Sequence, residues 1–333
     1  MKIRFGLVMA VVLLLVVAMN GFAGGSSQSS GGKHAITIGV GQPATHTYTL
    51  AFERFKAYAE EKSGGRLQIS IHHSNQLGNE KEMQEQISVG SIQIMCTGTL
   101  VTYEPLLAIY ELPYLFENRD QIKKFHQTQA VKDVAKKLES KNILLLGYFE
   151  NGFRQITNSS RPINSPADVR GLKIRTPENP AQMETFKALG AVVTPMAMNE
   201  LYGALQQRVV DGQENPLQNI ATNKFYEVQQ YMAITNHIYN SAYIIVGKKW
   251  YEGLPEDLRK IVTDGLKEVE TWQMKTCEEI DVRYLGELKA AGMQVTTPNI
   301  ADFRNAVMPV YQVFINQYGR EAQVIIDAAQ SVR

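Results

Sequence analysis

Apolar and polar residues alternate in short runs along the first third of the chain. Apolar residues occupy every second position over 36–40, which predicts a strand with one buried face. Over 48–62 they recur at helical spacing, and a Gly-Gly pair then ends the helix. Two more strands are predicted around 67–71 and 92–96, with Asn79 capping a helix between them. This strand–helix order predicts a parallel sheet covered on both faces by helices.

A second alternating unit begins with the apolar run 144–149. The same patterns predict the elements that follow it, which are strands at 173–175, 192–194, 210–213 and 243–246 and helices at 181–189 and 199–207. Open sheets of this kind bind ligands beyond the carboxyl ends of their strands. In the first unit those ends lead into the loops 41–47, 74–80 and 97–99.

An unusually long helical pattern begins at Pro255 and runs to about Ala291, where Gly292 ends it. At about 1.5 Å per residue this helix would be on the order of 50 Å long, which is more than one domain needs. Its amphipathic pattern predicts packing along the whole length. Two ordinary helices with a break between them are the alternative.

The N-terminal segment has the pattern of a secretion signal. Two basic residues precede an apolar run over 5–19, and small residues at 21 and 23 suit cleavage. We therefore expect a cleavable signal peptide at 1–23 and a periplasmic location. The apolar run is shorter than the roughly 20 residues that span a bilayer, and an uncleaved anchor is the alternative. The Gly- and Ser-rich stretch 24–33 is expected to be a disordered leader.

Composition limits the classes of function. The chain has 34 Lys and Arg against 33 Asp and Glu, and removal of residues 1–23 takes away two basic residues, which leaves 32 against 33. That balance argues against nucleic-acid binding, which requires a basic face. The remaining ~300 residues exceed one compact core and favour two domains. Cys96 and Cys277 are expected to be free thiols, with a disulfide between them as the alternative.

The segment 171–215 carries the strongest functional pattern. Arg175 ends a short apolar strand pattern, and Pro177 follows closely. An arginine held at a strand end suits a carboxylate, because its planar fork donates two parallel hydrogen bonds to the two oxygens. A lone arginine on a strand can equally be a surface residue or an ion-pair partner. The surrounding sequence must therefore show whether Arg175 is a ligand-binding residue.

The surrounding motifs resemble those of the solute-binding proteins of tripartite ATP-independent periplasmic (TRAP) transporters, the DctP family. The resemblance rests on the stretches 171–175, 190–196, 200–206, 211–216, 74–78 and 111–116. It implies a two-domain α/β fold like that of periplasmic binding proteins, with mixed and parallel sheets, a hinge and a long helix spanning both domains. Domain I is expected at 34–152 plus 241–281, and domain II at 153–240 plus 282–333.

The resemblance also implies roles for three polar residues. Arg175 would hold the ligand carboxylate, Arg154 would give it a second donor, and Asn215 would reach the same group. An ion pair that stabilises the hinge is the alternative for Arg154, and turn formation by Asn-Pro is the alternative for Asn215. The family further implies an organic acid as ligand, a TRAP membrane permease as partner, no cofactor and no catalysis. We expect a monomer.

Polar residues beyond the strand ends are expected to determine which ligand binds. Glu80 lies where relatives place an acidic residue that takes ligand hydroxyls, and its charge would repel a second ligand carboxylate. Further predicted ligand contacts are His46, Thr97, Glu178 and Met198. The sialic-acid-binding branch is less similar, because Gly98 and Val101 stand where that branch has a glutamate and an arginine, and Met198 replaces a phenylalanine.

These departures favour a hexuronate or an aldonate over a larger nonulosonic acid. A C4-dicarboxylate or another small carboxylate is the first alternative, and a secreted enzyme acting on a sugar acid is the second. The run 39–44 fits a dinucleotide-binding fingerprint, but Pro43 removes an amide that a phosphate would need. His72 and His73 would point to opposite faces of a strand, so a shared metal ion is not expected.

Overall fold

The computed structural model describes residues 32–333, so the predicted signal peptide and residues 24–31 of the predicted leader lie outside the described residues. The strands of this range are β1 His34–Val40, β2 Leu67–His72, β3 Ile94–Thr97, β4 Ile143–Asn158, β5 Lys173–Thr176, β6 Val192–Pro195, β7 Gly212–Pro216, β8 Tyr231–Ala233, β9 Tyr239–Gly247 and β10 Gln294–Thr296.

The helices of the same range are α1 Thr47–Lys62, α2 Glu80–Val89, α3 Arg119–His126, α4 Gln129–Lys137, α5 Pro180–Ala188, α6 Met198–Gln206, α7 Leu217–Thr222, α8 Lys248–Gly253, α9 Glu256–Ala290, α10 Ile300–Val307, α11 Pro309–Tyr318 and α12 Arg320–Gln330. Short 3-10 helices occur at Pro105–Glu111, Leu138–Lys141, Pro166–Val169 and Phe225–Glu227. None of these helices combines the length and the apolar character that crossing a bilayer requires.

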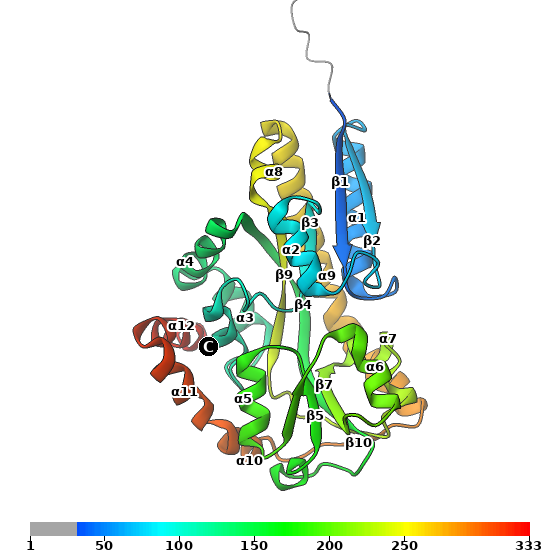
Figure 1. Cartoon of the computed structure of the whole chain (residues 1–333), viewed down its shortest axis with the longest axis vertical. Helices are drawn as coiled ribbons and strands as arrows, with labels where there is room; N and C mark the ends of the chain where they lie inside the picture. The colour runs from blue at the N-terminus through cyan, green and yellow to red at the C-terminus, as the bar shows by residue number, and fades with distance from the viewer. Residues whose placement is uncertain (1–31) are drawn as a thin grey trace, which may run out of the picture. The chain divides into compact units, whose positions relative to one another are not determined.

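Strand β4 joins two sheets (Figure 1). The first sheet has the order β2-β1-β3-β9-β4, and in the second β4 pairs with β7 and β8. From β7 the second sheet continues to β5 and β6, while β10 pairs with β8. β2 and β3 both run parallel to β1, as predicted, whereas β9 is antiparallel to β3 and to β4. The first sheet is therefore mixed, because β9, from the second half of the chain, is inserted antiparallel between β3 and β4.

The strand predicted at 144–149 is much longer in the structure and forms the first part of β4. Its pairing with β9 shifts register between Leu145 and Gly147 and again between Glu150 and Gly152. Gly152 has a φ of +116°, a conformation that glycine adopts without the strain other residues would incur. Beyond this point β4 pairs with β7, so the chain passes from the first sheet to the second near Gly152.

Helix α9 runs unbroken beside both sheets, which confirms the prediction of one long helix (Figure 1). Leu266 on its first half packs into the apolar core of the first sheet. Ile280 and Leu288 on its second half pack into a separate core beside the second sheet. Gly265 lets α9 approach α1 closely, because a β-carbon there would lie 2.7 Å from the Tyr58 ring. A single helix therefore packs against both sheets.

Asn79 is the N-cap of α2, as predicted, and Glu82 completes a reciprocal cap that was not predicted. The Asn79 side chain accepts a hydrogen bond from the Glu82 backbone N–H at 3.1 Å, and the Glu82 carboxylate accepts one from the Asn79 N–H at 2.8 Å. This reciprocal arrangement satisfies two amides that the first turn leaves unpaired. Gly90 then ends the helix with a φ of +89°. The cap places Glu80 at the first position of α2.

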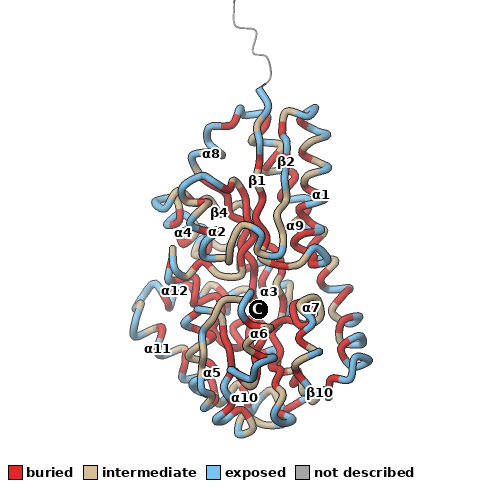
Figure 2. The backbone as a smooth tube through the Cα atoms, turned by 45° about the vertical axis from the view of Figure 1, so that its right-hand side comes forward, coloured by how far each residue is buried: buried red, intermediate tan, exposed pale blue. Residues whose placement is uncertain are grey.

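Buried positions follow the central strands, while the outer helices α11 and α12 carry many exposed ones (Figure 2). β9 is buried along its whole length, which explains its continuous apolar run at 243–246. Cys96 on β3 and Cys277 on α9 are buried and free, as predicted. The strand predicted at 210–213 begins only at Gly212, and Asn215 therefore lies inside a buried strand and not in a turn.

Candidate ligand-binding site

A cavity of about 320 Å³ lies where elements of the two sheets meet. Its walls carry many amide and charged side chains, which are Gln42, Asn75, Asn79, Glu80, Lys81, Gln84, Asn151, Arg154, Arg175, Glu178, Gln182, Asn199, Glu200, Asn215, Asn219 and Asn240. Most of the ligand contacts predicted from sequence are among the lining residues, namely Glu80, Arg154, Arg175, Glu178, Met198 and Asn215. His46 and Thr97 are not among the lining residues.

Arg175 is a buried cation on β5, with only 3% of its surface exposed. Its Nε and Nη2 atoms both donate to the Met196 carbonyl oxygen, at 3.0 and 2.7 Å. Among residues 32–333, no Asp or Glu forms an ion pair with it. Burial lowers the pKa of Arg175 to about 10, and Glu214 opposes this shift only in part. The guanidinium is therefore still charged at neutral pH and has donors left for a ligand.

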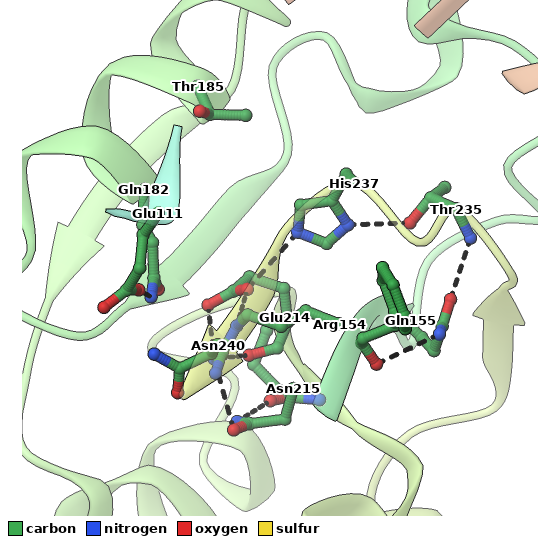
Figure 3. Close-up of polar contacts among 12 residues, drawn as sticks. Glu111, Arg154, Gln155, Gln182, Thr185, Glu214, Asn215, Thr235, His237 and Asn240 are labelled. Carbon is green, nitrogen blue, oxygen red and sulfur yellow. Dashed lines mark hydrogen bonds and ion pairs between the residues drawn. The ribbon is translucent and has the colours of Figure 1, made fainter. Parts of the chain in front are cut away.

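Arg154 on β4 differs from Arg175, because a carboxylate already neutralises it (Figure 3). Its Nη2 atom donates to Glu214 Oε1 at 2.8 Å, and its Nε atom donates to Glu214 Oε2. The same Nη2 atom lies 3.2 Å from Asn215 Oδ1. Arg154 therefore forms an ion pair within the second sheet, between β4 and β7. A ligand carboxylate would thus share this arginine with Glu214.

Glu214 and His237 belong to this charged cluster and were missed in the sequence. Glu214 is fully buried on β7, and His237 Nε2 lies 3.3 Å from its Oε2 atom (Figure 3). Burial works to raise the pKa of Glu214, but Arg154 and His237 outweigh it and hold the pKa below the ordinary value. Burial lowers the pKa of His237, so its imidazole is held in the neutral form. A carboxylate in a buried strand was the available signal, since such a charge requires a cation beside it.

Glu80 lines the cavity from the first turn of α2. Its Oε2 atom accepts hydrogen bonds from the Thr97 hydroxyl at 2.8 Å and from the Gly98 N–H at 3.1 Å. Burial raises the pKa of Glu80, and these two hydrogen bonds offset part of the rise. Thr97 is fully buried behind Glu80, so it holds the carboxylate and does not form part of the cavity wall.

His46 is likewise placed behind the wall and not in it. It is 1% exposed, and its Nε2 atom lies 2.8 Å from Asn219 Oδ1. Burial lowers the pKa of His46 to about 3, so the ring is neutral at physiological pH. Asn219 in turn donates to Asn215 Oδ1 at 3.0 Å. The asparagines in front of the ring line the cavity, whereas His46 itself does not.

The other predicted contacts are less constrained. Glu178 is exposed at the cavity edge, and Met198 is half-buried at the start of α6. Glu150 is buried and does not line the cavity, and its two carboxylate oxygens accept hydrogen bonds from Arg119 Nε at 2.8 and 3.0 Å. Within residues 32–333, no group of three or more His, Cys, Asp or Glu is arranged to hold a metal ion.

A further carboxyl group lies behind the wall. Glu111 is buried and accepts a hydrogen bond from the Gln182 amide, while its Oε1 atom has no hydrogen-bond partner (Figure 3). Burial raises the pKa of Glu111 to about 8, with the Gln182 hydrogen bond offsetting part of the rise. Gln182 itself lines the cavity, so the protonation of Glu111 is linked to one of the cavity's amides.

The family model of the bacterial extracellular solute-binding proteins, family 7 (DctP), matches residues 38–317. The chain belongs to this family. A curated DctP relative, the C4-dicarboxylate-binding periplasmic protein of Rhodobacter capsulatus, is 31% identical over 83% of this chain and 85% of its own length.

Solved structures of DctP proteins are also similar to this chain. A TRAP periplasmic solute-binding protein from Polaromonas sp. JS666, bound to D-erythronate, is 33% identical with a TM-score of 0.86, covering 90% of this chain and 99% of its own. The sugar acid binding protein of Advenella mimigardefordensis, in complex with galactonate, is 30% identical with a TM-score of 0.87, covering 91% and 99%. The predicted family and the predicted two-domain α/β fold class are confirmed by these similarities.

Proposed function

We propose that this DctP protein is the extracytoplasmic receptor of a TRAP transporter and captures a monocarboxylic sugar acid, such as an aldonate or a hexuronate. The observation that supports this most is Arg175, a buried cation in the cavity wall without an ion-pair partner among residues 32–333. A buried charge is costly unless it is paired. A ligand carboxylate would supply the missing partner and use the donors that the Met196 carbonyl leaves free.

The rest of the wall suits hydroxyl groups. Amide side chains such as Asn151 and Asn240 both donate and accept hydrogen bonds, as sugar hydroxyls do. The ionised Glu80 carboxylate can only accept hydrogen bonds, so it would accept one from a ligand hydroxyl group. A second ligand carboxylate about 4 Å from Glu80 would cost roughly 4 kcal/mol at an effective dielectric constant near 20. The ligand therefore carries its single carboxylate at the Arg175 side of the cavity.

A C4-dicarboxylate is the second candidate, because the Rhodobacter relative is named for binding one. The two ligand classes make opposite demands on Glu80. A dicarboxylate requires this group to be protonated or turned away, whereas a sugar acid uses it as an acceptor. The solved neighbours with D-erythronate and galactonate support the sugar acid.

A thermal-shift screen tests the ligand class. Binding to the native state raises the melting temperature, by an amount that grows with ligand concentration over Kd. We expect D-galactonate, D-erythronate or D-glucuronate to raise it and succinate to leave it unchanged. A shift with succinate and none with any sugar acid would contradict the proposal. Quantifying the acid after incubation with purified protein tests the enzyme alternative, since a binding protein consumes none.

Capture is proposed to involve closure of domain I, at 34–152 plus 241–281, on domain II, at 153–240 plus 282–333. The segments that connect them are the β4 crossing near Gly152, the start of β9 and helix α9. The closed face would then be presented to a membrane permease outside the cytoplasm. We expect a smaller radius of gyration in small-angle scattering with ligand than without. An identical profile at saturating ligand would mean that the cavity is preformed.

A further inference from the structure

The ring of His46 has a defined tautomer. His46 is the N-cap of α1, and its Nδ1 atom accepts a hydrogen bond from the Tyr48 backbone N–H at 3.2 Å. A backbone N–H can only donate, so Nδ1 carries a lone pair and no hydrogen. In the neutral ring the hydrogen must then be on Nε2. The helix cap therefore fixes which ring nitrogen faces the cavity side as a donor.

That donor sets the orientation of the first cavity amide. The Nε2–H group donates to Asn219 Oδ1 at 2.8 Å. The amide nitrogen of Asn219 must then point the other way, where it donates to Asn151 Oδ1 at 3.1 Å and to Asn215 Oδ1 at 3.0 Å. Both hydrogens of this amide are used, which leaves Asn219 no freedom to flip.

The direction passes on through two more amides. Asn151 donates through Nδ2 to Asn240 Oδ1, and Asn240 donates through Nδ2 to the Gly98 carbonyl oxygen at 3.2 Å. A carbonyl can only accept. The far end of the chain therefore demands the same direction that His46 imposes at the near end. Reversing any one amide would place two donors or two acceptors face to face.

We propose that His46 is a positioning residue of the ligand site, which together with the Gly98 carbonyl at the far end fixes the direction of the hydrogen-bond chain Asn219–Asn151–Asn240–Gly98 and so decides which amide atoms the cavity presents. In this direction Asn151 uses one of its two N–H groups within the chain and keeps the other for a ligand oxygen. In the opposite direction it would present an oxygen. Which acid occupies the cavity rests on the proposed function, whereas the direction of the chain does not.

A role in helix capping alone is the competing explanation, and two substitutions separate the roles. His46→Asn keeps a good N-cap acceptor, but its shorter side chain cannot reach Asn219. His46→Gln extends an amide N–H toward Asn219, but glutamine is a poor N-cap. If His46 positions the amides, ligand affinity should fall only in the variant that loses the contact with Asn219. If His46 only caps α1, ligand affinity should fall only in the variant that destabilises α1.

The first experiment needs no ligand. In nitrogen-15 NMR of the free protein at neutral pH, we expect the His46 ring to be protonated at Nε2 and bare at Nδ1. In His46→Asn, the side-chain amide signals of Asn219, Asn151 and Asn240 should shift together, because their chain has lost its first donor. A His46 ring protonated at Nδ1, or amide signals that stay in place, would overturn the proposal.

The second experiment compares melting temperature and affinity for D-galactonate. His46→Asn should melt close to the wild type and bind about tenfold more weakly, the cost of a lost hydrogen bond. His46→Gln should melt about 2–4 °C lower, the cost of a lost cap, and bind within about threefold of the wild type. Equal affinity in His46→Asn and wild type, or affinity that falls in step with melting temperature in both variants, would refute positioning.

A double variant checks that the effect travels through the chain. Asn151→Ala should weaken binding by itself, and adding His46→Asn should cost little more, since both break the same chain. Fully additive losses would mean that His46 acts by another route. If the wild type binds succinate and no sugar acid, the proposed ligand class fails, and the same comparison is made with succinate. The two failures are therefore distinguishable.

Discussion

Replacing Arg175 by lysine keeps the positive charge and removes the planar fork, so it tests whether geometry or charge binds the carboxylate. Arg175 holds the Met196 carbonyl with two donors, at 3.0 and 2.7 Å, and still has Nη1 for the ligand. A lysine ammonium is a single point and cannot serve both directions with the same geometry. At least one charge-assisted hydrogen bond to the ligand should therefore be lost.

The expected magnitude follows from that loss. A hydrogen bond to a charged group contributes roughly 1.5–3 kcal/mol, which corresponds to about tenfold to over a hundredfold in affinity. Burial makes the upper end of this range the better expectation, because water cannot replace the missing donor at a side chain that is 3% exposed.

Isothermal titration calorimetry with the sugar acid that binds the wild type measures the effect. Arg161→Lys is a matched control, because the exposed Arg161 also donates from Nε and Nη2 to backbone carbonyl oxygens, of Asp168 at 2.8 Å and of Arg170 at 2.7 Å. This control should bind like the wild type. An Arg175→Lys affinity within about threefold of the wild type would show that the fork does not contact the carboxylate.

Three further substitutions test the charges around the cavity. Glu80→Gln should increase the affinity for succinate relative to that for the sugar acid by at least about tenfold in calorimetry, because the negative charge that repels a second carboxylate is gone. An unchanged ratio of the two affinities would show that Glu80 does not determine selectivity. Glu214→Gln should cost about 3–5 kcal/mol in urea unfolding, because Arg154 would be left buried without its partner; a loss below about 1 kcal/mol would contradict this. Glu111 has a pKa raised to about 8 from 4.5, so its contribution to stability is present below the ordinary value and lost as pH rises through the folded value. The stability of Glu111→Gln should therefore rise relative to that of the wild type by about 1.4 kcal/mol per pH unit between roughly pH 5 and 8, as measured by urea unfolding; a difference that does not change with pH would contradict this.

The sequence alone determined the elements whose signals are local. The reciprocal cap of α2 needs only Asn79 and a glutamate three positions later, and both lie within one helical turn. The length of α9 followed from an apolar pattern that repeats along the helix. The motifs between residues 74 and 216 identified the family, because each of them is a short contiguous run that can be recognised without knowing the fold.

Only the tertiary structure decided which distant side chains meet. The pairing of Arg154 with Glu214 joins positions 60 residues apart, and the contact of His46 with Asn219 joins positions 173 apart. These contacts depend on β9 entering the first sheet antiparallel and on β4 continuing into the second, which no local pattern indicates. Burial then sets the chemistry, because the same imidazole that would be a solvated ligand contact on a loop becomes a neutral, oriented donor once it is enclosed.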